Sequence, residues 1–553
     1  MSAGGRARFT AERVLELPRA RPAGGTALSY VLAYPNRYFV GMANLGFQTL
    51  LHLLSGFEES RCHRAFSDHP ESLESGKPLS AYDAVALSLS FEGDYPEALR
   101  MLSAGGVPLL AAERGPSDPL VLAGGVAATL NPEPLAPFLD VVYLGEAEAG
   151  LVALHAFLAA YRTLPRSEVL DLLAERGLPG VYVPSRYRTD EEGGRLLGRA
   201  PTGRAPVTVE RVWAVEPWDP ARTHILASED AFGGAYLLEV SRGCPHACRF
   251  CAAGHATRPA RFLPFETLAP FVRSGAGAGR LGLVGAAVSD HPDFRRLARE
   301  CLERAAGFTV SSFRAESLDE EVLGLLVRGG LKTLTIAAEG GGERLRQRLG
   351  KGISREDLLR AARLAGAAGL ESLRIYGMVG LPGEEEADVS ALGDLAVEAR
   401  QAMGRGSVTL SVAPFVPKPH TPFQWEPMLS EADLRARIRS LERGAARHRG
   451  VRVVAEAPKW SRVQGLLSRG GREVAPLLAE ASRTGDWRSV LRSALAAAVL
   501  DRERAPGERF PWDFIGGLPS REHLLREREA AGSSTRLPFP CLPGVCRACG
   551  VCS

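Results

Sequence analysis

Between residues 235 and 420 the chain repeats one pattern six times, and this repeat constrains the fold more than any other feature. Each unit is a strand-like apolar run followed by an amphipathic helix pattern, with runs at 236–240, 281–288, 309–313, 333–338, 373–379 and 408–413. Strands that alternate with helices form parallel sheets covered by helices. Asp319, Ser354 and Glu384 are expected near helix starts, where acceptors and negative charge are favoured. We therefore predict a partial (β/α)6 barrel over 231–450, with its functional groups at the carboxyl ends of the strands.

A second α/β pattern comes before this repeat. Apolar runs alternate with helical stretches at 46–54 and 95–103, and the runs lie at 28–33, 84–90, 107–111, 120–124 and 141–144. This pattern predicts a Rossmann-like, open and mostly parallel sheet over residues 1–165. Gly124 and Gly125 directly follow one run, where the missing side chain lets the backbone approach a ligand.

The remaining segments give weaker signals. Residues 166–230, with a proline-rich stretch at 201–220, are expected to be a linker. Residues 451–553 are expected to form a helical region, with helices over 474–482, 487–500 and 520–531, that ends in four cysteines. The fold class is therefore α/β, with three structured regions.

The composition excludes some classes of function. The chain has 553 residues, a net charge of +3 and five lysines among 67 basic residues, and no basic block stands out as it would in a polyanion-binding protein. The N-terminal residues lack a signal sequence, and the longest apolar stretches are too short to span a bilayer. We expect a cytoplasmic protein with no membrane segment.

Seven of the nine cysteines lie in two tight groups, three at 244–251 and four at 541–552. Grouped cysteines in a chain without a secretion signal are more typical of metal ligands than of disulfides. Cys62 and Cys301 stand alone and are expected to pack as small apolar side chains.

Cys244, Cys248 and Cys251 are separated by three residues and then by two, just after the first predicted barrel strand. A [4Fe–4S] cluster needs one outer ligand for each iron, so three cysteines leave one iron open. A structural zinc site closes all four positions instead. This loop, with the aromatic Phe250 before its last cysteine, resembles the radical S-adenosylmethionine superfamily.

The resemblance implies two cofactors, a [4Fe–4S] cluster and S-adenosylmethionine, with Phe250 in the cofactor-binding loop. It also implies that one electron from a reducing partner such as flavodoxin or ferredoxin breaks a carbon–sulfur bond. The resulting deoxyadenosyl radical then takes hydrogen from the substrate, while the protein orients the cofactor and excludes water.

Two further segments of the barrel extend the resemblance. Residues 335–344 are similar to the strand-four segment of MiaB-like and cobalamin-associated members, in which a glutamate contacts the ribose or the amino group. Glu339 matches that glutamate, although Gly340 stands where serine is more usual. Residues 374–384 are similar to the strand-five signature, whose glycines, including Gly380, permit close approach to the cofactor. Arg314 and Arg374 are candidates to hold the cofactor carboxylate by a planar fork, and the alternative for each is an ion pair that supports the fold.

Residues 1–165 resemble the cobalamin-binding domain fused to many radical enzymes. The similarity rests on residues 34–35, 41–46, 122–125 and 145–148. The Asp-x-His-x-x-Gly motif, whose histidine replaces the lower cobalt ligand, is absent. Two alternatives follow: cobalamin binds without a protein histidine, or the domain only frames the substrate channel.

The cysteines at the end of the sequence form a second candidate metal site. Cys541, Cys546, Cys549 and Cys552 lie within twelve residues and could close either a second iron–sulfur cluster or a zinc site. Taken as a whole, the chain resembles an uncharacterised family of cobalamin-domain radical S-adenosylmethionine proteins with a C-terminal four-cysteine motif.

The resemblance favours an enzyme that cleaves S-adenosylmethionine to begin radical chemistry on a substrate that the sequence does not identify. If cobalamin binds, methyl transfer to an unactivated carbon is the leading reaction. A second hypothesis is a radical enzyme that modifies RNA, such as a tRNA methylthiotransferase. The N-terminal domain of those enzymes carries a cysteine triad, whereas Cys62 is alone here. A third is a non-catalytic iron–sulfur electron carrier or RNA-binding protein, which would not need Glu339 or the strand-five glycines.

Overall fold

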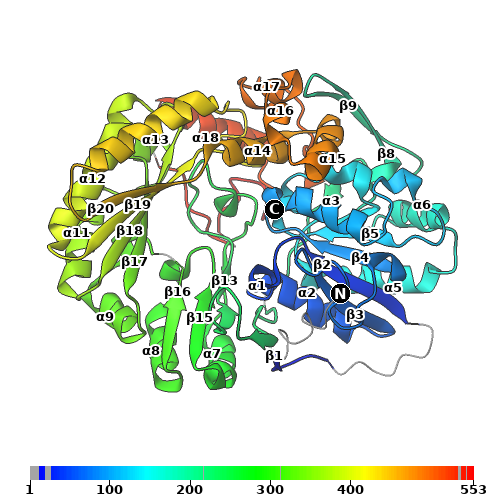
Figure 1. The fold of residues 1–553 in the computed structure, drawn as a ribbon, viewed down its shortest axis with the longest axis horizontal. Coiled ribbons are helices and arrows are strands. Elements are labelled where there is room, and N and C mark those ends of the chain that lie inside the picture. The colour runs from blue at the N-terminus through cyan, green and yellow to red at the C-terminus, as the bar shows by residue number, and fades with distance from the viewer. Residues whose placement is uncertain are drawn as a thin grey trace. The chain divides into compact units, whose positions relative to one another are not determined.

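The computed structural model describes residues 12–18, 27–215, 217–311, 313–533, 537–543 and 545–552. The chain folds into two compact units (Figure 1). The first contains the residues up to Ala235 together with Leu466–Val499 and Gly507–Gly517, and the second contains Tyr236–Gly465, Leu500–Pro506 and the residues from Leu518 onward. Both units are mixed α/β with parallel sheets, which confirms the predicted fold class. Within the described ranges, every helix is too short or too polar to span a lipid bilayer.

The first unit is built on a six-stranded sheet with the order β3-β2-β4-β5-β6-β7. Its strands are β2 (Leu28–Tyr34), β3 (Ser60–Phe66), β4 (Ala84–Ser88), β5 (Leu120–Gly124), β6 (Val141–Tyr143) and β7 (Val181–Tyr182). All neighbours are parallel except β6 and β7. The central strands are buried almost throughout, as expected for a parallel sheet covered on both faces. The predicted open, mostly parallel sheet is confirmed.

One strand prediction in this unit is wrong. The predicted run at 107–111 forms no strand, and Pro108 within it has no backbone N–H to donate to a ladder. The strand that the prediction missed is β3, which lies at the sheet edge and is only half-buried over Arg61–His63. Because β3 contains polar residues, it does not form the continuous apolar run by which the other strands were predicted.

The expected linker at 166–230 is folded within the first unit. It contributes β7 to the sheet, and β8 (Tyr187–Glu192) and β9 (Arg195–Pro201) form an antiparallel hairpin. Two further short strands, β10 (Val209–Glu210) and β11 (Ile225–Ala227), pair with β21 (Ile515–Gly516) and β1 (Glu12–Val14). The helices of this unit are α1 (Tyr38–Gly41), α2 (Leu45–Gly56), α3 (Tyr95–Ala104), α4 (Val126–Leu130), α5 (Leu151–Tyr161), α6 (Arg166–Arg176), α15 (Ala475–Thr484) and α16 (Trp487–Leu491).

The second unit contains seven parallel strands in two sheets, β12-β15-β16 and β17-β18-β19-β20. A parallel bridge between Phe313 and Ile336 joins the two sheets. The strands are β12 (Tyr236–Glu239), β15 (Arg280–Val284), β16 (Gly307–Val310), β17 (Thr333–Glu339), β18 (Ser372–Val379), β19 (Ser407–Pro414) and β20 (Val451–Ala455). All six predicted strands are present, and β20 extends the predicted six-strand barrel to seven. Strand β20 was not predicted from the sequence, and none of its residues is fully buried.

Helices cover one face of these strands (Figure 1). They are α7 (Phe265–Gly275), α8 (Phe294–Arg304), α9 (Glu320–Arg328), α10 (Glu343–Arg348), α11 (Arg355–Ala367), α12 (Glu386–Met403) and α13 (Glu431–Ala445). The boundary between the units falls within α14 (Pro458–Arg469), α17 (Ala494–Leu500) belongs to the first unit except for Leu500, and α18 (Arg521–Ser533) belongs to the second. Asp319, Ser354 and Glu384 all lie at or near the starts of helices α9, α11 and α12, as predicted, and Asp319 and Ser354 are the capping residues. Glu384 is not a cap, because the α12 cap is Glu385, and Glu384 instead accepts a bond from the Gly380 N–H.

Candidate functional site

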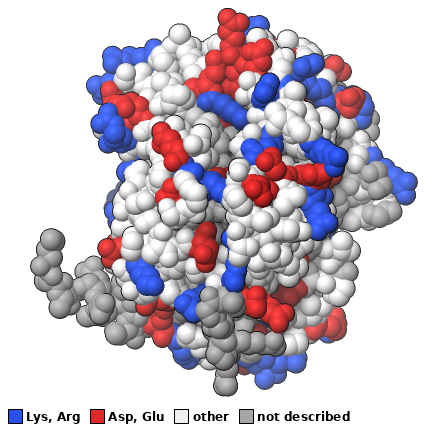
Figure 2. All heavy atoms as spheres, turned by 90° about the vertical axis from the view of Figure 1, so that its right-hand side faces the viewer, with Lys and Arg blue, Asp and Glu red and all other residues white. Residues whose placement is uncertain are grey.

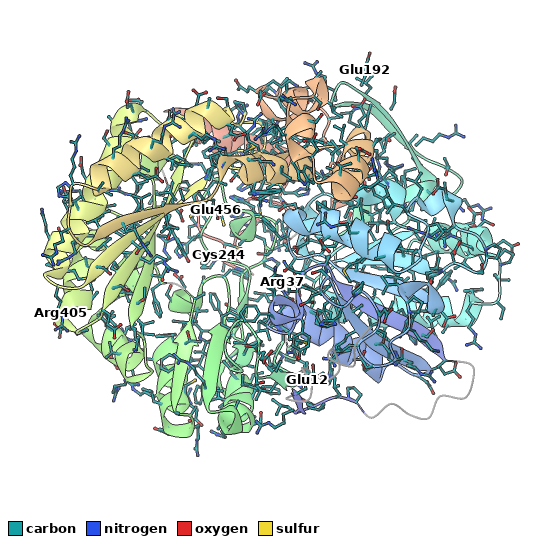
Figure 3. The ribbon with its side chains drawn as sticks, viewed as in Figure 1. Glu12, Arg37, Glu192, Cys244, Arg405 and Glu456 are labelled. Carbon is teal, nitrogen blue, oxygen red and sulfur yellow. The ribbon has the colours of Figure 1, made fainter. Side chains whose placement is uncertain are left out.

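The three-cysteine loop begins and ends at a short antiparallel ladder. Strands β13 (Ser241–Arg242) and β14 (Arg261–Phe262) pair at its base, just after β12. Gly243, with φ of +72°, enters the loop where an added Cβ would lie 2.6 Å from the Thr257 carbonyl oxygen. The loop therefore starts from a closed base at the carboxyl end of a barrel strand. Figure 3 shows Cys244 on the concave side of the strands of the second unit.

Cys244, Cys248 and Cys251 are all free thiols, and Cys248 is buried. Burial raises the pKa of Cys244 to about 12, and the nearby Cys251 and Cys248 contribute in the same direction. Burial and the Cys248 sulfur likewise raise the pKa of Cys251. One buried and two partly buried thiols near one another favour a cationic partner that would stabilise their thiolates.

The donor set that this loop offers to a metal centre is three cysteine thiols. A cubane cluster binds each cysteine to a different iron, so its ligands stand farther apart than those of a zinc ion. The donor set of this loop is therefore compatible with a [4Fe–4S] cluster.

Two residues between the cysteines anchor the loop to helices. The Arg249 side chain, 1% exposed, pairs with Glu527 of α18 at 3.1 Å and donates to the carbonyl oxygens of Gln347 and Arg348. Phe250 packs, partly buried, against an apolar cluster formed by Leu345, Leu349, Leu381, Phe415, Phe423 and Ala531. The loop is thus held between α10 and α18.

Glu339 ends β17 in an unusual backbone conformation. Its φ is +64°, in the left-handed region that residues other than glycine rarely adopt, and the strand register shifts between Ala337 and Glu339. Its carboxylate accepts a bond from Lys351 Nζ at 3.1 Å, and the two side chains are 15% and 9% exposed. Burial by itself would lower the pKa of Lys351, but attraction to Glu339 and Cys248 outweighs it and raises the pKa.

Lys351 is a site residue that was not predicted from the sequence. The available signal was its rarity, since it is one of only five lysines in a chain whose basic residues are almost all arginine.

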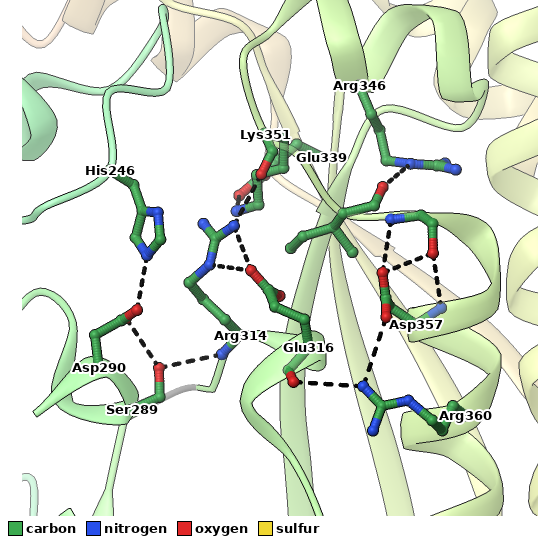
Figure 4. A network of polar contacts seen from close by, with 12 residues as sticks. His246, Ser289, Asp290, Arg314, Glu316, Glu339, Arg346, Lys351, Asp357 and Arg360 are labelled. Carbon is green, nitrogen blue, oxygen red and sulfur yellow. Dashed lines mark hydrogen bonds and ion pairs between the residues drawn. The ribbon is translucent and has the colours of Figure 1, made fainter. Parts of the chain in front are cut away.

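A chain of polar contacts leads away from the cysteine loop (Figure 4). His246 Nε2 lies 2.8 Å from Asp290 Oδ1, and the Ser289 hydroxyl links Asp290 to the Arg314 N–H. The Arg314 side chain donates to the Glu316 carboxylate and, at 2.9 Å, to the Lys351 carbonyl oxygen. Arg314 thus lies beside the Lys351–Glu339 pair.

Arg374 and Gly380 lie elsewhere on β18 or at its end. Arg374 is exposed and is paired in register with Thr335, and its side chain makes no hydrogen bond or ion pair to another described residue. It lies three residues before Gly377, the residue paired with Glu339, which is about 10 Å along the strand. Gly380 has φ of +82°, and an added Cβ would lie 2.8 Å from Leu434 Cδ2, so packing explains this glycine.

Gly125, in the first unit, also has a packing explanation. Its φ is +107°, and a Cβ there would lie 2.4 Å from the Leu89 carbonyl oxygen, whereas a Cβ at Gly124 would make only an ordinary contact. The same carboxyl edge of the sheet exposes Phe39, Phe91 and Val126, each about half exposed.

The C-terminal cysteines lie close to the first cysteine loop. The Cys541 N–H donates to the Pro245 carbonyl oxygen at 2.7 Å, next to Cys244 in the chain. Cys541 and Cys549 are buried, and Cys546 and Cys552 are partly buried. Burial raises the pKa of Cys552, and the sulfurs of Cys541, Cys549 and Cys546 add to this effect, so the four thiols are near one another.

Acidic and basic side chains are mixed on the face drawn in Figure 2, and no large area of that face carries one sign of charge. That face of the molecule therefore offers no continuous basic surface for nucleic acid.

Two protein-family models match the chain. The model described as "Radical SAM proteins, N-terminal" matches residues 46–184, and "Radical SAM superfamily" matches residues 238–396. Together they cover more than half of the 553 residues.

Similar proteins were found among curated sequences and solved structures. The uncharacterized protein MJ0966 of Methanocaldococcus jannaschii is 28% identical over 452 residues, which cover 81% of this chain and 90% of that protein. The radical S-adenosylmethionine methyltransferase TsrM from Kitasatospora setae, solved with cobalamin and a [4Fe–4S] cluster, is 16% identical with a TM-score of 0.45, covering 70% of this chain and 72% of TsrM. The cobalamin-dependent S-adenosylmethionine radical enzyme OxsB is 19% identical with a TM-score of 0.46, covering 69% of this chain and 52% of OxsB.

Proposed function

Because the chain belongs to the radical S-adenosylmethionine superfamily, we propose that it cleaves S-adenosylmethionine reductively at a [4Fe–4S] cluster bound by Cys244, Cys248 and Cys251. The observation that carries this proposal is the anchored loop of three free thiols at the carboxyl ends of the barrel strands. The bound cluster and S-adenosylmethionine supply the electron-driven cleavage of a carbon–sulfur bond. The residues of this chain hold both cofactors and exclude water.

Glu339 is the proposed acceptor for a hydroxyl or ammonium group of S-adenosylmethionine. An ionised carboxylate forms short, strong bonds with such donors. Its ion pair with Lys351 and its left-handed backbone hold the carboxylate in one direction. Lys351 is therefore a positioning residue, which acts on the cofactor through Glu339.

Arg314 and Arg374 remain candidates to bind the cofactor carboxylate. They differ in whether their side chains already have hydrogen-bond partners in the protein. Two nitrogens of Arg314 already donate to Glu316 and to the Lys351 carbonyl oxygen. Arg374 has no such partner among the described residues but starts farther from Glu339. If one of them binds the carboxylate, its replacement by Gln raises KM for S-adenosylmethionine more than it lowers kcat.

The test is anaerobic and quantitative. The protein is reconstituted with iron and sulfide, reduced with titanium(III) citrate and given S-adenosylmethionine, and 5′-deoxyadenosine is measured by mass spectrometry. Wild type should form it, Cys251→Ala should not, and Cys62→Ala, outside both cysteine groups, should behave as wild type. Equal background from wild type and Cys251→Ala, with the cluster intact in wild type, would refute the proposal.

A second candidate function, cobalamin-dependent methyl transfer, is favoured by the carboxyl edge of the first sheet. Its strand order places a topological switch between β2 and β4, the position where open α/β sheets bind ligands. Phe39, Phe91 and Val126 expose apolar surface at that edge, which suits a flat macrocycle. Hydroxocobalamin should co-purify with wild type and be lost from Phe91→Asp, as followed by absorption. Cobalamin-free protein that still yields a methylated product would contradict it.

RNA is the alternative substrate class, and the mixed charges in Figure 2 give it no support. Filter binding to tRNA tests it, with tight, salt-sensitive retention as the result that would revive it.

A further inference from the structure

We propose that Cys541, Cys546, Cys549 and Cys552 hold a second iron–sulfur cluster that passes electrons to the cluster of the Cys244 loop. The relay role rests on the proposed function, whereas the presence of the second cluster does not. The C-terminal segment has three features of such a site: its cysteine spacing, its local hydrogen bonds and its position against the first loop.

The spacing favours iron and sulfide over zinc. Cys546, Cys549 and Cys552 are each separated by two residues, which is the C-x2-C-x2-C triplet of bacterial iron–sulfur runs. Cys541 provides the fourth ligand, so this cluster would have all four irons capped and could serve as an electron carrier. A zinc site would instead bind all four thiolates to one ion.

The backbone of this segment is folded around its sulfurs. The Cys546 N–H donates to Leu542, and the Gly550 N–H donates to Arg547, so the segment makes two successive turns. The Ala548 N–H points at Cys546 Sγ at 3.4 Å. Hydrogen bonds of this kind to cysteine sulfur tune the potentials of iron–sulfur centres.

The segment is joined to the first cysteine loop through α18. The Cys549 carbonyl oxygen accepts from the Ser520 N–H at 2.9 Å, at the start of α18. Helix α18 is in turn tied to the first cysteine loop through Glu527 and Arg249. Both cysteine groups therefore belong to one packed region.

The two groups are close enough for direct electron transfer. Because the Cys541 N–H bonds to the carbonyl oxygen of Pro245, the Cα atoms of Cys541 and Cys244 lie within about 10 Å of each other. Clusters ligated by these residues would be near neighbours, and electron transfer between metal centres is fastest over short distances.

The proposed step transfers one electron and nothing else. A low-potential flavin or iron–sulfur protein loses one electron, and the C-terminal cluster gains it and then passes it to the cluster of the Cys244 loop. The C-terminal cluster returns to its starting state, and no proton or ligand is exchanged.

The first test counts metal in the full-length protein. After anaerobic reconstitution, wild type should hold about eight irons per chain. Cys546→Ala/Cys552→Ala and Cys244→Ala/Cys248→Ala/Cys251→Ala should each hold about four, and electron paramagnetic resonance should show a distinct reduced cluster in each. Cys62→Ala is the control that keeps both. One zinc per chain at the C-terminal cysteines, or iron that disappears only with the loop cysteines, would overturn the proposal.

The second test separates a relay from a structural role. With reduced flavodoxin as donor, Cys546→Ala/Cys552→Ala should form 5′-deoxyadenosine at least tenfold more slowly than wild type. With titanium(III) citrate, which reaches the loop cluster directly, the two proteins should be equal. Equal rates with flavodoxin, or equal losses with both donors, would overturn the relay. If wild type is inactive with titanium(III) citrate, the proposed function fails instead, and the iron count still decides the second cluster.

Discussion

Lys351 Nζ lies 3.1 Å from Glu339 Oε1, and this buried ion pair joins the end of β17 to the segment between α10 and α11. Glu339 occupies a left-handed conformation that ordinarily costs about 1–2 kcal/mol for a residue with a side chain. Strained residues of this kind persist where the surrounding contacts hold them, and they concentrate at functional sites. The pair therefore both holds an unfavourable backbone and fixes the Glu339 carboxylate in place.

Replacing Lys351 should cost stability because it leaves a buried carboxylate without its partner. We expect Lys351→Met to lower the free energy of unfolding of the second unit by about 3 kcal/mol, as measured by urea denaturation. The double variant Lys351→Met/Glu339→Gln should recover most of that loss, since neither charge then remains buried alone. Losses that simply add in the double variant would show that the two side chains are not coupled.

The same region shows how far the sequence can be interpreted. The cysteine spacing, the parallel strands and Glu339 at a strand end could be predicted, because spacing and hydrophobic pattern are local properties. Lys351 could not, because it meets Glu339 only through the packing of α10 against the strand. The strands β3 and β20 were missed for a related reason: their exposed or half-buried residues lack the apolar runs that mark buried strands.

The sequence does not reveal why glycine occurs at particular positions of this chain. Sequence alone suggests that Gly125 and Gly380 admit a cofactor, but in the structure each also has a positive φ and a close protein neighbour. The reason that a position requires glycine can be identified only when the surrounding backbone is known.

Gly125→Ala should be among the most damaging small changes in the first unit. The new Cβ would meet backbone atoms of Leu89, which cannot move aside as a side chain can, and φ would be strained as well. We expect a loss of more than about 3 kcal/mol in thermal or urea unfolding, or no soluble protein. Gly177→Ala is the matched control, because Gly177 also has a positive φ but no atom within 4 Å of the added Cβ. It should cost only about 1–2 kcal/mol. Similar losses for the two variants would remove the packing explanation.

Glu384 should make stability depend on pH. Burial raises the pKa of Glu384 to about 7, although the Gly380 N–H and Arg437 act in the opposite direction. The folded protein thus keeps a proton that the unfolded chain releases near pH 4.5. The stability contributed by this group therefore falls as the pH rises from about 4.5 to about 7, by at most about 1.4 kcal/mol per pH unit, and is constant above.

Glu384→Gln should remove that dependence, and urea unfolding of both proteins across this pH range measures it. Glu386→Gln, an exposed carboxylate in the first turn of α12, should leave the slope unchanged. A constant difference between wild type and Glu384→Gln would mean that Glu384 is already ionised in its pair with Arg437, 2.8 Å away.

Arg249 should decide whether the cysteine loop keeps its cluster. Its buried guanidinium pairs with Glu527 and donates to two carbonyl oxygens at the end of α10, and a single Lys ammonium cannot reproduce that fork. We expect both Arg249→Ala and Arg249→Lys to lose iron from the loop several-fold faster than wild type during dialysis against a chelator. Arg249→Ala should also cost about 3 kcal/mol of stability. Arg273→Ala is the control, because its pair with Glu300 has a half-exposed arginine and should contribute less than about 1 kcal/mol.

Since α18 also carries the contacts of the C-terminal segment, Arg249→Ala should loosen the C-terminal cluster as well. Faster loss from the loop alone, with the C-terminal iron retained as in wild type, would show that α18 is held to the second unit independently of Arg249.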